Sequence, residues 1–274
     1  MNHYQIKNIT NRHYRNLKKH FRKIKKHFDA EAIHEFRVEY KKLRAFLRLI
    51  SKVTGRKETA KISGKLKRCY AVAGSLRDLQ LQQQRFLKIS AQEVEKPSAY
   101  IHLLNKYIRA SQTRLRKLLL KKTLDKNKKN SEQFIPCAIG SSHFRNYVED
   151  IWASIFTTIE QENISDKDIH KVRKHLKDLF YNFKELVRNE DDVATLKAIV
   201  GKDEKDFDQL LEEIGIYLDI CNAIDLLKPQ RIHKLNKEDQ ESLIRIKMRL
   251  LQDESKLKRS IEQKIVDELP KPAI

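Results

Sequence analysis

Residues 33–51 carry two helical stripes side by side, and this pairing constrains the fold more than any other feature of the chain. Apolar side chains recur at alternating steps of three and four residues, the spacing of one buried helix face: Ile33, Phe36, Tyr40, Leu43, Leu47 and Ile50. Basic side chains follow the same steps one position later: His34, Arg37, Lys41, Arg44 and Arg48. At about 100° per residue, these five fit within an arc of roughly 80° beside the apolar face. The pattern predicts a helix whose cations line a groove between packed helices, a site suited to a long anion.

The same pattern returns in residues 169–186, at a constant offset of 136 residues. His170, Arg173 and Lys177 repeat the histidine, arginine and lysine of the first copy, and Lys184 stands opposite Arg48. Because the apolar stripe is preserved in the same register, we interpret the two segments as a duplicated helix, one in each half of the chain. A second correspondence, with an offset of 141, pairs Gly74 and Asp78 with Gly215 and Asp219.

The composition favours an all-α fold. Only six glycines and five prolines interrupt 274 residues, and 35% of the residues are charged. Residues 125–142 show no sustained helical period and contain Pro136 and Gly140, so we expect a linker there. This predicts two four-helix bundles, in residues 1–130 and 131–274. The expected helices lie near residues 4–27, 29–55, 58–90 and 98–122, then near 143–162, 165–186, 203–227 and 239–268.

The net charge of +21 is concentrated in the first half. Residues 1–130 hold 35 Lys and Arg against 9 Asp and Glu, whereas residues 131–274 hold 23 against 28. The two balances are therefore +26 and −5, which indicates a polyanionic partner met mainly by the first half.

Several classes of protein are not favoured. No apolar run approaches the length of a membrane span, and residues 1–16 are too polar for a secretory signal. Cys69, Cys137 and Cys221 are odd in number and widely spaced, so neither a disulfide framework nor a metal site is indicated. We therefore expect a cytoplasmic protein without a cofactor.

Further cations share helix faces in the first half and are candidates for the same anion site. For the first helix, a solvated basic face remains an equal alternative. These additional candidates are Arg12, Arg15, Lys19, Lys61, Lys65, Arg68, Lys106, Arg109 and Arg116.

The segments HEFRVEYKKLR (34–44) and HKVRKHLK (170–177), together with AGSLRDL (73–79), resemble the CHAD domain, the conserved-histidine α-helical domain. The resemblance covers nearly the whole chain. It implies two four-helix bundles related by a pseudo-twofold axis, around a basic central channel or groove that binds inorganic polyphosphate, and an association with polyphosphate granules. Matching the motif residue by residue assigns the anion contacts to His34, Arg37, Lys41, Arg44, His170, Arg173 and Lys177. Phe180 replaces the equivalent of Arg44, and Leu218 that of Arg77, so the two halves are expected to contribute unequally.

Two other functions fit the charge. A nucleic-acid-binding protein is the first alternative, although the aromatic residues fall mostly on core stripes and no known DNA- or RNA-binding motif is present. A polyphosphate-processing enzyme is the second, but the basic stripes contain few of the carboxylates that hold metal ions for phosphoryl transfer. We expect no catalytic residues and non-catalytic binding of inorganic polyphosphate.

Overall fold

The computed structural model describes residues 1–55, 62–90, 97–161, 163–186 and 204–269, and in this part of the chain the fold is all-α. The one exception to helical pairing there is an isolated bridge between Asn2 and Ala138. The helices are α1 (His3–His27), α2 (Ala30–Thr54), α3 (Gly64–Ser90), α4 (Ser98–Leu118), α5 (Lys121–Glu132), α6 (Ser141–Ile159), α7 (Asp166–Leu186), α9 (Glu204–Leu226), α10 (Pro229–Ile232) and α11 (Lys237–Glu268).

Local sequence signals explain where the two duplicated helices begin and where the first one ends. The Asp29 carboxylate accepts a hydrogen bond from the Ala32 amide at 2.8 Å and caps α2. Gly55 follows the same helix with a φ of 61°, a left-handed conformation that glycine adopts without steric cost. Before α7, the backbone amides and side chains of Ser165 and Asp168 bond each other at 3.0 and 3.3 Å, which forms a capping box.

The first part of the predicted linker is wrong, because residues 121–132 form α5. Its buried face is largely polar, so apolar periodicity could not reveal it. The Asn127 carboxamide oxygen accepts from the Ser63 amide at 2.7 Å, and its nitrogen donates to the Ser63 hydroxyl at 2.9 Å. The Tyr14 and Ser131 hydroxyls are 2.7 Å apart. These hydrogen bonds hold α5 against α1 and the start of α3.

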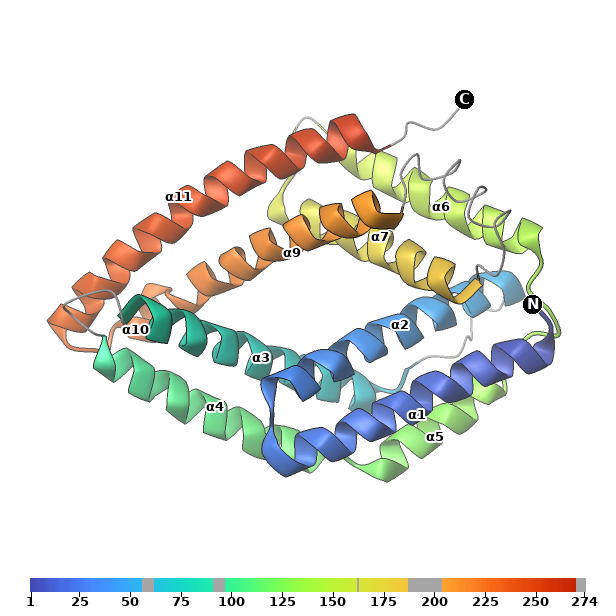
Figure 1. Ribbon diagram of the computed structural model, residues 1–274, viewed down its shortest axis with the longest axis horizontal. Coiled ribbons are helices and arrows are strands. Elements are labelled where there is room, and N and C mark those ends of the chain that lie inside the picture. Colours follow the sequence, from blue (N-terminus) through green and yellow to red (C-terminus); the bar gives the residue numbers. More distant parts are fainter. Residues whose placement is uncertain (56–61, 91–96, 162, 187–203, 270–274) are drawn as a thin grey trace.

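The helices form an inner and an outer layer (Figure 1). In the first half α1 packs on α2 and α4 on α3, and in the second half α6 packs on α7 and α11 on α9. The inner helices α2, α3, α9 and α7 each contact the next, so they form a ring in which α2 meets α7 and α3 meets α9 across the two halves. The division into domains at residue 130 stays a prediction.

The duplicated apolar stripes form the centre of the core. Ile33 and Phe36 on α2 and Ile169 and Val172 on α7 are all completely buried. Asn182 holds the junction between the halves, because its buried amide donates to the Ala45 carbonyl at 3.1 Å and to the Tyr147 hydroxyl at 3.0 Å. Among the described residues, no helix has the length and apolarity needed to cross a membrane.

Candidate functional site

Arg37 on α2 lies against a glycine of the neighbouring helix. A Cβ built on Gly74 of α3 would come within 1.9 Å of the Arg37 Nη1, so the guanidinium occupies the space that any larger residue would fill. The same guanidinium carbon stands 5.2 Å from the centre of the Tyr70 ring, and that ring stacks on Tyr40 at 4.2 Å. Glycine and tyrosine together fix Arg37 in the inner layer.

Arg173 on α7 makes the equivalent contact in the second half. A Cβ on Gly215 of α9 would lie 2.8 Å from the Arg173 Nη2, and Arg173 Nε donates to the Leu211 carbonyl at 3.3 Å. Gly74 and Gly215, which the sequence pairs, therefore each leave space for one arginine of the neighbouring inner helix. We call these two spaces the arginine seats.

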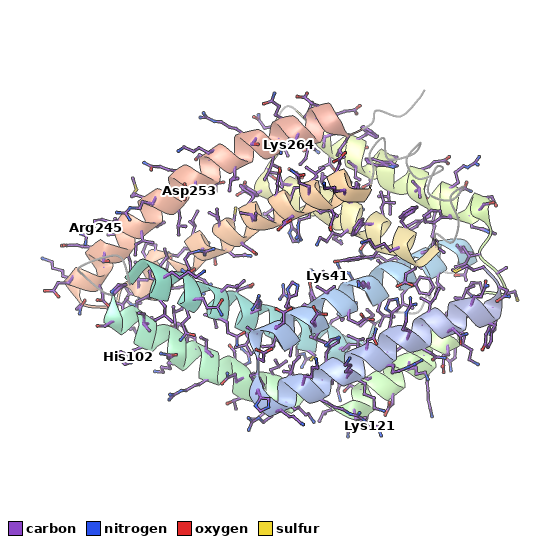
Figure 2. The ribbon with its side chains drawn as sticks, viewed as in Figure 1. Lys41, His102, Lys121, Arg245, Asp253 and Lys264 are labelled. Atoms are coloured by element: carbon purple, nitrogen blue, oxygen red, sulfur yellow. The ribbon has the colours of Figure 1, made fainter. Side chains whose placement is uncertain are left out.

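Lys41 and Lys177 bring the charges of the two halves together. Figure 2 places Lys41 on the side of α2 that faces α7 and α9. Partial burial, followed by the positive charges of Lys177 and Arg173, lowers the pKa of Lys41 to about 7. Arg37 and Arg44, on the same helix as Lys41, act in the same direction. Partial burial and then Arg173 lower the pKa of Lys177 to about 8.

Arg44 contributes an unsatisfied donor to this cluster. Its Nε is buried and has no hydrogen-bond partner within the described part of the chain. On the facing helix, partial burial followed by the charges of Arg48 and Arg44 lowers the pKa of Lys174. We call the set that converges here the central cation cluster: Arg37, Lys41, Arg44, Arg173 and Lys177.

His34 and His170 occupy the same position in their helices, the fifth residue of α2 and of α7. Both are exposed overall, but nearby protein atoms partly desolvate the imidazoles and lower the pKa of each. Cations act in the same direction, Arg77 foremost for His34 and Arg173 foremost for His170. Reduced hydration is the largest cause for both histidines, and at His34 the Glu31 carboxylate opposes it more strongly than any single cation supports it.

Comparison with known proteins gives a family. The family model of the CHAD domain matches residues 8–228. The chain belongs to the CHAD family. A crystal structure of the CHAD domain from the plant Ricinus communis is similar with a TM-score of 0.72 and 17% sequence identity, over 97% of this chain and 91% of that one. At this identity the similarity shows the fold alone. No curated protein matches the chain.

Two of the cations that the sequence assigned to the anion site form ion pairs with carboxylates of α7. Arg48 forms an ion pair with the buried Asp178 of α7, and Arg12 forms one with Glu185 at the end of the same helix. Lys184 lies 4.3 Å from the centre of the Phe180 ring. Arg12 and Arg48 therefore join the two halves of the protein, and we leave them out of the central cation cluster.

The other predicted site residues lie away from the central cation cluster. Lys65 and Arg68 line a pocket with α5, and Arg15 lines a different one between α1 and α5. Arg116 packs its guanidinium 5.2 Å from the centre of the Phe28 ring. Lys19 on α1 is exposed, as are Lys106 and Arg109 on α4. Lys61 lies outside the described residues.

The sequence brought Arg77 into the site only through its replacement by Leu218 in the second half, and it gave no place there to Lys174 or to the acidic pair Asp78 and Asp219. Partial burial raises the pKa of Asp78, and Arg37 opposes this while Asp219 adds to it. These carboxylates stand one helical turn beyond Gly74 and Gly215 on their helices. That spacing was the one signal able to place them beside the two arginines.

Among the described residues, one group has the spacing to hold a metal ion: Asp166, Cys221 and Glu254. It lies where α7 begins, between α9 and α11, and one oxygen of each carboxylate already has a partner. The Tyr217 hydroxyl is 2.7 Å from Asp166 and 3.1 Å from Glu254, and the Lys258 ammonium is 2.8 Å from Asp166. The group therefore stands apart from the central cation cluster, and Tyr217 and Lys258 already contact its carboxylates.

The Gly74 seat gives a direct test of how Arg37 is positioned. We expect Gly74→Ala to displace the Arg37 guanidinium and to weaken anion binding severalfold, while helix content stays the same, because alanine favours a helix interior over glycine by about 1 kcal/mol. Ser75→Ala, at the exposed neighbouring position, is the matched control. Circular dichroism and a binding titration decide; equal affinity in both variants would mean that the seat does not position Arg37 for binding.

Proposed function

We propose that this CHAD protein binds inorganic polyphosphate, without chemical conversion, along the inner cationic surface formed by α2 and α7. The observation that carries the proposal is the convergence of cations from both halves on Lys41, with a buried Arg44 Nε that has no partner among the described residues. Cations held this close repel one another unless an anion joins them, and a buried donor without an acceptor is costly.

The geometry of a helix suits a chain of phosphates. Successive cations on one face rise by about 5.4 Å per turn, so α2 can follow several units of an extended polymer. Arg37 and Arg173 can each bind two oxygens of one phosphate through the planar guanidinium, whereas Lys41 and Lys177 act as more mobile charges. The two halves then hold one ligand from both sides.

Catalysis is not part of the proposal. Phosphoryl transfer needs carboxylates that present a metal ion to the reacting phosphate. The acids nearest the arginine seats are Asp78, which acts on Arg37, and Asp219, which acts on Arg173. We infer that they hold the two guanidinium groups in place. With this ligand, association with polyphosphate granules in the cytoplasm belongs to the same proposal.

Competition separates this function from nucleic-acid binding. We expect labelled long-chain polyphosphate to be displaced by unlabelled polyphosphate and to be retained when duplex DNA is added at the same concentration of charge, because a duplex is too wide to lie between packed helices. Displacement by the duplex at equal charge would favour the nucleic-acid function. Release of inorganic phosphate on addition of magnesium or manganese would instead indicate an enzyme.

The two lysines predict a distinct pH dependence. Before binding, the pKa of Lys41 is about 7 and that of Lys177 about 8, both below the ordinary value for lysine. A bound polyanion favours their charged forms, so binding takes up protons and affinity falls, by about tenfold or more, as the pH rises from about 7 to about 10.

The stability of the unliganded protein should change in the opposite direction. Over the same pH range the unfolded chain binds more protons than the folded chain at these lysines, so stability rises with pH.

Calorimetric titrations with polyphosphate in two buffers of different ionisation enthalpy measure the proton uptake on binding. The affinity of Lys41→Gln should change less with pH than that of the natural protein. If the affinity of both proteins is the same at every pH, the bound anion does not reach Lys41.

A further inference from the structure

A second basic pocket lies away from the central cation cluster. It has a volume of about 630 Å³, within the range of pockets that bind small ligands, and its walls carry Lys65 and Arg68 from α3 and Lys122 and Lys126 from α5. Figure 2 shows Lys121, next to Lys122 at the start of α5, on the outer side of the molecule, whereas Lys41 faces the interior.

The geometry of α3 separates this pocket from the arginine seats. Lys65 precedes Gly74 by nine residues, which amounts to about 180° of rotation and about 14 Å of rise along a helix. The two residues therefore present their side chains to opposite sides of α3. The pocket is also absent from the duplication, because Lys65 corresponds to Asp206 and Arg68 to Gln209 in the second half.

Hydrogen bonds join the two helices that line the pocket. Asn127 is 2% exposed, and its carboxamide ties the start of α3 to α5 through the Ser63 amide and hydroxyl, at 2.7 and 2.9 Å. Thr123 is also buried and lies one turn before Asn127 on the same helix. The pocket thus lies between two helices that these hydrogen bonds join, and its lining combines four cations with Ser63, Thr123 and Asn127.

The four cations have no counter-ion among the residues that the structure describes. Within the described part of the chain, none of the four forms an ion pair, and the residues that line the pocket include no carboxylate. They also include no aromatic ring on which a base could stack. A ligand for this pocket must therefore carry several negative charges in a small volume, and no nucleobase is recognised.

We propose that the pocket between α3 and α5 is a second anion site, which binds a short linear phosphate such as inorganic tripolyphosphate. Four cations around a cavity of this size match the charge of such an ion, and Arg68 supplies the planar fork that binds two phosphate oxygens at once. The ligand is either a separate short phosphate or a distant segment of the chain that the central cation cluster holds; the second source rests on the proposed function.

Calorimetry with tripolyphosphate on the full chain tests this site. We expect the natural protein to show two binding events and Lys65→Gln/Lys122→Gln to lose one of them, with at least about tenfold weaker affinity. Lys237→Gln/Lys256→Gln, at exposed positions of α11, removes the same charge and should keep both events. If the two double variants give the same isotherm, the outer site does not exist.

Two further measurements distinguish a separate short phosphate from a segment of a long chain, and the outer site from the central cation cluster. With a polyphosphate of about one hundred units, weaker binding of Lys65→Gln/Lys122→Gln than of the α11 variant shows that one chain reaches both sites. Unchanged long-chain binding with a lost tripolyphosphate event shows a site for a separate ligand. Arg37→Ala/Arg173→Ala should remove only the central event. If that variant binds normally while the outer event depends on Lys65 and Lys122, the proposed central function fails and the outer site stands.

Discussion

Long-chain polyphosphate is expected to bind about a hundredfold more weakly at about 200 mM salt than at about 50 mM. Each cation that meets a phosphate releases condensed counterions, and the affinity for a flexible single chain falls with a logarithmic slope of about 0.7 per contact. Five contacts, one for each member of the central cation cluster, give a slope of about 3.5. Fluorescence titrations at four or five salt concentrations measure it.

The slope also counts the contacts. In Arg37→Ala/Arg173→Ala it should become shallower by about 1.4, because two phosphate contacts are lost. Arg114→Ala/Arg259→Ala, at exposed positions of α4 and α11, removes equal charge and should leave it almost unchanged. A slope near one in the natural protein would contradict a ligand held by cations from two helices.

Replacing Arg37 and Arg173 together by alanine is expected to weaken polyphosphate binding by about a hundredfold or more at low salt. Hydrogen bonds to charged groups contribute about 1.5–3 kcal/mol each, and these two arginines are the planar donors that the glycine seats hold in place. Helix content should not change, because neither guanidinium belongs to the apolar core. The measurement is a titration at about 50 mM salt beside circular dichroism.

A lysine pair distinguishes charge from geometry. Arg37→Lys/Arg173→Lys keeps the charges but loses the planar fork, so its affinity should fall between those of the natural protein and the alanine variant. Unaltered affinity in the alanine variant, with the Arg114→Ala/Arg259→Ala variant as reference, would remove the proposed site.

The duplicated helices could be predicted because their signal is local. Apolar side chains at steps of three and four define the buried faces of α2 and α7, and the caps at Asp29 and Ser165 fix where these helices begin. The correspondence of Gly74 with Gly215 came from the same comparison of positions, whereas the arginine that each glycine meets on the neighbouring helix is visible only in the structure. The spacing of residues along one helix is enough to predict its buried face and its first residue.

The partners of each cation could not be predicted because they depend on which helices meet. Arg48 shares one helix face with Lys41, yet α7 places Asp178 against Arg48 and Lys177 near Lys41. Lys65 shares α3 with Gly74 but faces α5 on the other side. A stripe on one helix shows which residues are neighbours on that helix, and it leaves open what the packing partner presents to each of them.

The helix α5 was missed for a different reason. Hydrogen bonds of Asn127 and Ser131, rather than an apolar stripe, bury its inner face, and Leu124 is the one large apolar residue there. A stretch of polar residues without an apolar period is typical of a loop, so the sequence predicted a linker here. Their partners, Ser63 and Tyr14, lie 64 and 117 residues away along the chain.

A crystal structure with a short polyphosphate bound tests the central claim most directly, because it shows which side chains meet the ligand. We predict phosphate oxygens within hydrogen-bond distance of Lys41 and of Arg173 in the same molecule, with the Arg44 Nε donating to the same ligand. A phosphate chain found only on the outer surface, with Lys41 and Lys177 still facing each other without an anion, would contradict it.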